Sequence, residues 1–291
     1  MKVVYSPRYE IALPGHIWPT TKYRLIVERL RASPRIAIVE PALASWDDLA
    51  LVHTAEYLSK LRDNTLTPED VATLELPWVP ALADAFRLMV GGTIAAARAA
   101  MDDGVAAHVG GGLHHAFANH GEGFCPLNDV AVAVRVVQSE GRVHRAAIVD
   151  LDVHHGNGTA MIFERDEAVF TFSVHQQHNY PFFKPRGRLD IGLEDGAADA
   201  RYLALLSDAM PQVMAHEPDL VVYLAGADPY ERDRLGGLKL TKHGLAERDR
   251  LVIDAVRAAR VPLVTVLAGG YAEDVNDTVD IHVATIEAML G

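Results

Sequence analysis

Six short apolar segments, each followed by a loop rich in glycine, histidine or aspartate, constrain the fold of this chain most strongly. They are almost continuously apolar and do not alternate, which is the pattern of strands buried on both faces of a parallel sheet. The segments are Val3–Tyr5, Val105–Val109, Ala146–Asp150, Val169–Val174, Leu220–Leu224 and Leu263–Leu267. The sequence therefore predicts a parallel sheet covered by helices on both sides.

Longer segments with helical spacing lie between these predicted strands. They are residues 80–101, 157–165, 198–216, 241–260 and 274–290. Strands that alternate with helices are typical of an α/β protein. Because no linker-like change of composition interrupts the pattern, we expect one domain over residues 1–291 with a three-layer α/β/α architecture.

Composition excludes several classes of protein. The 27 Lys and Arg against 39 Asp and Glu give a net charge of −12, which argues against sequence-independent binding to nucleic acid. A single cysteine, Cys125, excludes an internal disulfide framework and fits a reducing compartment. The N-terminus has no apolar signal core, and no uncharged apolar run reaches the roughly 18 residues of a membrane span. We therefore expect a cytoplasmic protein without a membrane span.

Candidate metal ligands follow two of the predicted strands. Ligands of open parallel sheets bind at the carboxyl ends of the strands. Asp152 and His154 are two residues apart, so both point to the same side of an extended strand end, and Asp228 follows another strand. A lone residue of this kind is more often a cap. Three together favour a catalytic zinc site with an open position, and the same ligands also suit Fe²⁺.

A tandem histidine and a tyrosine follow two further strands. His114 and His115 come directly after the glycine run and Leu113, and Tyr271 comes after two glycines. Two imidazoles beside a metal suit general acid–base catalysis, because the pKa of histidine lies near neutral pH. A phenol can stabilise a developing oxyanion. The sequence thus predicts metal ligands and proton donors at one edge of the sheet.

Five segments carry a more specific signal. They are GGGLHHA (110–116), GFCPLNDVAVA (123–133), DLDVHHGNGTA (150–160), LAGADPYERDRLGGLKLT (224–241) and LAGGY (267–271). Their order and spacing resemble the histone deacetylase superfamily, which includes acetoin-utilisation proteins and acetylpolyamine amidohydrolases. PGHIWPTTKY (14–23) and VHTAEYL (52–58) extend the resemblance over nearly the whole chain. It implies the arginase/deacetylase fold, a mainly parallel sheet of about eight strands between helical layers.

The resemblance also implies an activity. Zinc would be held by the three ligands named above, and the enzyme would remove acetyl or longer acyl groups from acyl-lysine or a related N-acyl amine. His115 would act as general base and then as general acid, with His114 as its electrostatic partner. Tyr271 would bind the carbonyl oxygen of the substrate.

Further positions match residues that line the narrow substrate tunnel in this superfamily. Gly123, Phe124 and Phe183 resemble the residues around the acyl-lysine stem, with Leu235 near the rim. Phe182 competes with Phe183 for this role because the two are adjacent. An apolar tunnel would hold the alkyl stem and exclude bulk water.

Three more positions concern the surroundings of the metal and of the general base. Asp150 and Ser173 match residues that help to hold a potassium ion (K⁺) beside the zinc. Asn157 stands where many members carry aspartate behind the second histidine, and a neutral partner leaves His115 less basic. The acidic rim residue that grips peptide substrates has no clear counterpart, because Asp84 is out of register.

Two alternative functions are weighed against this one. A ureohydrolase would need additional carboxylates to bridge two Mn²⁺ ions, but the chain continues from His154 as His155-Gly156. A non-catalytic acyl-amine binding protein would have lost a ligand, a tandem histidine or the tyrosine, and none is missing. Acetylated protein or peptide and small N-acyl amines such as acetylpolyamines both stay candidate substrates, and the acidic surface favours cationic ones. The sequence does not indicate an oligomeric state.

Overall fold

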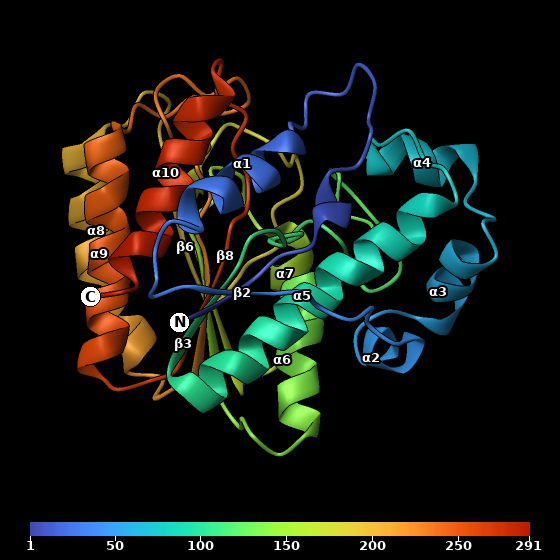
Figure 1. The fold of residues 1–291 in the computed structure, drawn as a ribbon, viewed down its shortest axis with the longest axis horizontal. Helices are drawn as coiled ribbons and strands as arrows, with labels where there is room; N and C mark the ends of the chain where they lie inside the picture. The colour runs from blue at the N-terminus through green and yellow to red at the C-terminus, as the bar shows by residue number, and fades with distance from the viewer.

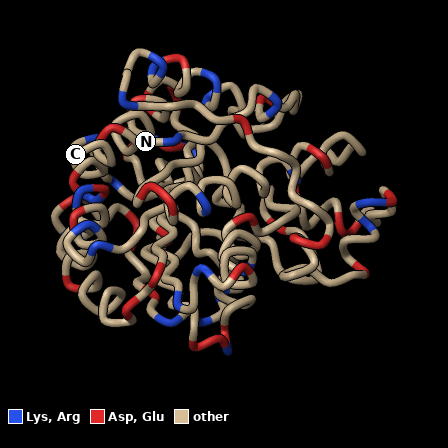
Figure 2. Tube along the Cα trace, turned by 60° about the horizontal axis from the view of Figure 1, so that its bottom comes forward, with Lys and Arg blue, Asp and Glu red and all other residues tan.

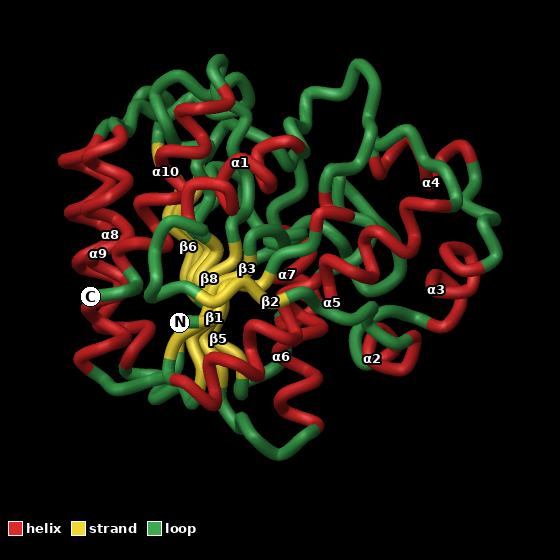
Figure 3. Tube along the Cα trace, in the orientation of Figure 1, coloured by secondary structure: helices red, strands yellow, loops and turns green.

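A sheet of eight parallel strands forms the centre of the molecule in the computed structural model, which describes all 291 residues. The strand order is β2-β1-β3-β8-β7-β4-β5-β6, and every pairing is parallel. Figure 3 shows the strands gathered in the centre of the molecule with helices around them. The strands are β1 (Lys2–Val4), β2 (Ala37–Val39), β3 (Val105–His108), β4 (Ala146–Asp150), β5 (Val169–Gln176), β6 (Leu189–Leu193), β7 (Leu220–Leu224) and β8 (Leu263–Val266). The predicted parallel sheet is thus confirmed.

The six predicted strands are all present, and the two additional ones lie at the edges of the sheet. β2 and β6 are the outermost strands, and β2 has no buried residue. In β6, Asp190 and Gly192 are exposed and alternate with the partly buried Leu189 and Ile191 and the buried Leu193. β2 is apolar in sequence but short and largely exposed, and Asp190 and Gly192 interrupt the apolar residues of β6, so neither segment has the pattern of a buried inner strand.

Two layers of helices cover the sheet (Figure 1). The helices α5 (Ala81–Asp103), α6 (Asp129–Ser139) and α7 (Asn157–Phe163) pack on one face. The other face carries α1 (Thr21–Leu30), α8 (Asp199–Met214), α9 (Lys242–Ala258) and α10 (Val275–Ala288). Three short helices, α2 (Trp46–Ala50), α3 (Ala55–Arg62) and α4 (Pro68–Leu74), lie outside α5, and a single 3₁₀ turn, η1, covers Pro7–Tyr9. The predicted three-layer architecture is confirmed.

The surface carries charges of both signs. Figure 2 shows Lys and Arg interspersed with Asp and Glu over the outer helices and loops. Among the helices, none combines the length and the apolar character that crossing a membrane requires.

Candidate active site

Three buried side chains meet where β4 and β7 end. Asp152 and His154 lie in the turn after β4, and Asp228 lies in the turn after β7, the neighbouring strand. One potential ligand atom from each lies within 4.8 Å of the others. His154 Nδ1 is 2.9 Å from an Asp152 oxygen and 3.4 Å from Asp228 Oδ2. The structure therefore brings the three predicted ligands together.

This cluster has the properties of a cation site. Asp228 is fully buried, and its Oδ2 has no hydrogen-bond partner in the protein. Burial and the neighbouring Asp152 raise the pKa of Asp228 to about 7, because two carboxylates in a buried site repel each other. A Cβ added to Gly269 would collide with Asp228 Oδ2, so only glycine at this position leaves room for the Asp228 carboxylate. Two carboxylates and one imidazole fit zinc, and they also fit Fe²⁺.

The three residues form the one cluster of potential metal ligands in the chain. A binuclear ureohydrolase site requires further carboxylates that bridge a second ion. His155, which follows the ligand pair, lies 3.4 Å from Asp190 instead. The ligand set is thus suited to one ion.

The glycine-rich loop after β3 carries the tandem histidines. Gly111 and Gly112 have φ angles of 72° and 76°, in the left-handed region that favours glycine. The buried carboxylate of Asp129 accepts the backbone N–H groups of Gly112 at 3.1 Å and Leu113 at 2.7 Å. These two bonds fix the loop just before His114.

His114 is paired with a carboxylate at the end of β4. Its Nδ1 lies 2.6 Å from Asp150 Oδ2. Burial alone lowers the pKa of His114, but the charges of Asp150 and Asp152 outweigh it and raise the pKa to about 9. Asp150 therefore keeps His114 cationic at neutral pH.

His115 differs from His114 in charge. Burial, together with the nearby His114 and His154, lowers the pKa of His115 well below its usual value. Its Nδ1 lies 2.8 Å from Asn157 Oδ1, and its Nε2 lies 3.1 Å from His114 Nε2. A neutral imidazole beside a cationic one is a proton acceptor placed next to a positive charge.

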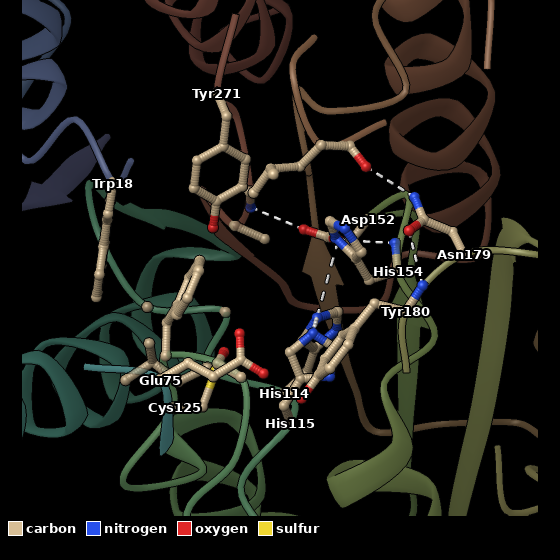
Figure 4. Close-up of a pocket in the computed structure, with 18 of the residues that line it drawn as sticks. Trp18, Glu75, His114, His115, Cys125, Asp152, His154, Asn179, Tyr180 and Tyr271 are labelled. Atoms are coloured by element: carbon tan, nitrogen blue, oxygen red, sulfur yellow. Dashed lines mark hydrogen bonds and ion pairs between the residues drawn. The ribbon is translucent and has the colours of Figure 1, made fainter. Parts of the chain in front are cut away.

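A cavity leads from the surface to this cluster (Figure 4). His114, His115, Asp152 and His154 line it, and Figure 4 shows the ring of Tyr271 pointing into the same space. Burial raises the pKa of Tyr271 well above its usual value, and Asp152 and Asp228 raise it further, so the phenol keeps its proton. Two of the predicted ligands, the tandem histidines and the tyrosine thus share one cavity, and the third ligand, Asp228, is buried next to His154.

Phe124 and Gly123 form part of the cavity wall, as the tunnel prediction has it. The ring of Phe124 packs edge-on against Tyr271, with 6.3 Å between centroids. Gly123 has a φ of 50°, and a Cβ there would lie 2.7 Å from the hydroxyl of Tyr180. Leu235 also lines the cavity, and its carbonyl accepts a hydrogen bond from Asn179 at 2.8 Å.

Phe183 is placed differently from the prediction. Its side chain is 58% exposed and lies outside the cavity lining, and the competing Phe182 is fully exposed. Lys184 Nζ donates to the carbonyl of Asn179 at 2.6 Å and closes this loop, so the two phenylalanines lie on its outside. Tyr180 takes the wall position instead, with its ring 5.0 Å from that of His115.

The two predicted potassium positions are neighbours. Asp150 and Ser173 are paired in register on β4 and β5, and both line a small cavity behind the site together with His155. The Ser173 hydroxyl lies 3.0 Å from His175 Nδ1. Potassium binding here stays a prediction.

Two charged residues of the cavity, Glu75 and Lys22, have no role predicted from the sequence. Glu75 is exposed and lies at the mouth of the cavity, at the C-terminal end of α4 with a φ of 55°. Asp84, by contrast, pairs with Arg87 on α5 and does not reach the cavity. Lys22 is 1% exposed, and its Nζ donates to the carbonyl of Ala268 at 3.1 Å. Lys22 belongs to the segment PGHIWPTTKY (14–23), but the resemblance of that segment assigns it no role.

Comparison with known proteins agrees with this geometry. The sequence profile of the histone deacetylase domain matches residues 16–286. The chain belongs to the histone deacetylase family. It is 32% identical over 288 residues to histone deacetylase 2 of Arabidopsis thaliana, covering 93% of this chain and 74% of that protein. It is 31% identical over 276 residues to the acetoin utilization protein AcuC of Bacillus subtilis, covering 85% and 71%.

The fold is that of the histone deacetylase family as well. The crystal structure of the HDA15 HD domain superposes with a TM-score of 0.82 at 25% identity, covering 100% of this chain and 91% of that one. An uncharacterized protein of Picosynechococcus sp. is 42% identical over 285 residues, covering 96% of this chain and 95% of that protein. Family membership and the shared fold support a deacetylase enzyme.

Proposed function

We propose that this protein is a zinc-dependent deacetylase that hydrolyses the amide of acetyl-lysine or of a related N-acyl amine. The observation that carries the proposal is that a buried three-ligand cluster, a cationic and a neutral histidine, and a protonated tyrosine lie together at one cavity. Membership of the histone deacetylase family supports the same chemistry.

Asp152, His154 and Asp228 would hold the metal. Zinc bound there would polarise the amide carbonyl and acidify a water molecule. Asp152 and His154 also line the cavity, so a metal held by the three residues would be accessible to water and substrate, as a catalytic zinc is and a structural zinc is not.

The two histidines would have different roles, one in proton transfer and one in electrostatic stabilisation. His115 is neutral, so its Nε2 can accept a proton from the attacking water and then deliver it to the leaving amine. His114, held cationic by Asp150, would stabilise negative charge that develops nearby. General acid–base catalysis of this kind contributes about 10²–10⁴ in rate.

Tyr271 would donate a hydrogen bond from its hydroxyl to the carbonyl oxygen as negative charge develops there. Its raised pKa keeps it a donor over the whole working pH range. A donor aimed at the oxygen of the transition state is worth about 10²–10³ in rate.

The cavity wall would grip the alkyl stem of the substrate. Phe124 and Tyr180 present aromatic surface, and Gly123 leaves room between them. Glu75 at the mouth would attract a cationic substrate or accept a hydrogen bond from the backbone of a peptide. Acetylated proteins and small acetylated amines therefore both fit, and we propose K⁺ at Asp150 and Ser173 as support for the site.

A substrate panel assayed with and without a chelator tests this function. Acetyl-lysine peptides, acetylated polyamines and long-chain acyl-lysines are incubated with zinc-loaded wild type, with His115→Ala and with His243→Ala, an exposed histidine on α9 as control. We expect hydrolysis of at least one class, its loss with chelator, and its loss in His115→Ala with zinc retained. The control should match wild type. Full activity after metal removal, or more than about a tenth of it in His115→Ala, would contradict the proposal.

A further inference from the structure

A carboxylate outside the cavity is connected to His115 through one intervening side chain. Asn157 lies between the two: its Oδ1 is 2.8 Å from His115 Nδ1, and its Nδ2 donates to Glu122 Oε1 at 2.7 Å. Glu122 belongs to neither the metal cluster nor the cavity lining. It directly precedes Gly123 in the chain.

The chemistry of these three groups fixes the direction of both hydrogen bonds. An ionised carboxylate can only accept, so the atom of Asn157 that faces Glu122 must be its NH₂ group. The amide oxygen of Asn157 then faces His115 and can likewise only accept. His115 Nδ1 must therefore carry the proton, which leaves Nε2 of the neutral ring as the bare nitrogen.

The surroundings of Glu122 keep it in the acceptor form. Burial raises its pKa, but hydrogen bonds from His120, Asn157 and Tyr180 outweigh this and lower the pKa overall. The same oxygen, Oε1, accepts from the Tyr180 hydroxyl at 3.2 Å, and His120 Nε2 lies 3.5 Å from Oε2. Glu122 is thus joined both to the base and to the cavity wall.

A glutamine at this position would remove the constraint without changing the shape. Its amide can turn either its oxygen or its NH₂ group toward Asn157, so Asn157 can rotate as well. A rotated Asn157 presents NH₂ to His115 Nδ1, and the ring proton then moves to Nε2, where it blocks proton acceptance. On the Nδ1 side of the ring, an acceptor-only group at position 122 excludes this arrangement; on the other side the cationic His114, whose Nε2 lies 3.1 Å from His115 Nε2, also disfavours it.

We propose that Glu122 is a positioning residue that acts through Asn157 to hold the His115 proton on Nδ1, so that Nε2 stays free to accept a proton. The inference rests on the deacetylase function proposed above. A carboxylate in direct contact with His115 Nδ1 would hold the proton there by itself. Here Glu122 does so from one side chain further away, through Asn157.

The test compares Glu122→Gln with the double variant that combines Asn157→Asp with Glu122→Gln. In the double variant, the carboxylate introduced at position 157 is itself the acceptor-only partner of His115 Nδ1, and the amide introduced at position 122 can donate to it. We expect kcat of Glu122→Gln to fall about tenfold with little change in KM, and the double variant to recover to within about threefold of wild type. Glu287→Gln, the same substitution at an exposed glutamate of α10, is the matched control and should keep wild-type kcat.

A spectroscopic readout separates this inference from the proposed activity. Long-range ¹H–¹⁵N spectra of zinc-loaded protein with labelled histidine report which ring nitrogen of His115 is protonated, whether or not any amide is hydrolysed. We expect Nδ1–H in wild type and in the double variant, and a mixture in Glu122→Gln. Nε2–H in wild type, an unchanged tautomer in Glu122→Gln, or an equal loss of kcat in Glu287→Gln would overturn the proposal.

Discussion

Tyr271 combines a fixed backbone with a side chain that reaches the cavity. Its N–H donates to Asp233 Oδ2 at 2.6 Å, which ties the loop after β8 to the loop after β7. The ammonium of Lys22 lies 5.6 Å from the centre of its ring, and Phe124 packs edge-on against it. The ring therefore has neighbours that hold its position, while its hydroxyl is available for a hydrogen bond to substrate.

Tyr271→Phe removes this hydroxyl and keeps the ring. If the hydroxyl acts mainly on the transition state, kcat should fall by about 10²–10³ while KM changes little. Zinc content should stay at the wild-type value, because the tyrosine is no ligand. Steady-state kinetics with elemental analysis check this. A change in KM alone would assign Tyr271 to substrate binding instead of catalysis.

At the scale of elements, one helix supports the ends of the two ligand-bearing strands. Arg248 of α9 is fully buried, and its Nη1 donates to the carbonyls of Leu151 at 3.3 Å and Gly226 at 2.6 Å. Both carbonyls lie shortly before a metal ligand in the chain. Arg248 is neutralised by Asp249, whose Oδ1 accepts from it at 2.8 and 2.9 Å. A buried ion pair on α9 thus holds the turns after β4 and β7.

Arg248→Met should destabilise the protein strongly. The substitution leaves the carboxylate of Asp249 buried without its cation, which costs about 3–5 kcal/mol of the free energy of unfolding. Combining it with Asp249→Asn removes the unpaired charge and should recover a large part of the loss. Urea unfolding of the two variants measures the difference. Equal stability of the single and the double variant would show that the pair does not carry this energy.

Elements also show where sequence patterns mislead. Residues 129–139, DVAVAVRVVQS, are rich in β-branched residues, as a buried strand would be, yet they form α6. Asn128 caps this helix by accepting the N–H of Ala131 at 2.9 Å, and eight of its residues are buried because it packs beside α5. Because this helix is buried on several sides, its sequence lacks the alternation of apolar and polar residues with a 3.6-residue period that an amphipathic helix shows.

At the scale of the whole molecule, the sheet brings negative charge together at the carboxyl ends of two inner strands. Asp152 and Asp228 are far apart in the chain, but β4 and β7 are adjacent, so both carboxylates end in one buried cluster. Burial, together with the charge of Asp152, raises the pKa of Asp228, so an ionised Asp228 without a cation nearby is unfavourable for folding. Metal binding and stability of the fold should therefore be linked.

Removal of zinc should lower the melting temperature of wild type. Free zinc at a hundred times its Kd stabilises a protein by about 2.7 kcal/mol, or roughly 5 °C for a chain of this size. Asp228→Asn should abolish this dependence, and its metal-free form should be at least as stable as metal-free wild type because one charge of the pair is gone. Asp254→Asn, on the exposed surface of α9, is the control and should keep the full zinc effect. A zinc-dependent shift in Asp228→Asn would contradict the ligand assignment.

The sequence by itself determined the central strands, the three-layer architecture and the family. It did so because inner strands of a parallel sheet are buried on both faces and read as continuous apolar runs, and because the carboxyl ends of such strands carry the predicted ligands, tandem histidines and Tyr271. Both features depend on residues that are close in the sequence or on where each strand ends, so the residue pattern alone is enough to predict them.

Only the tertiary structure decided which side chains surround that chemistry. Tyr180 and not Phe183 forms the cavity wall, because the loop closed by Lys184 faces its phenylalanines outward. Glu75 reaches the cavity mouth from α4, and Glu122 reaches His115 through Asn157. Such contacts depend on how loops from distant parts of the chain pack against one another, and no periodicity or spacing in the sequence encodes that packing.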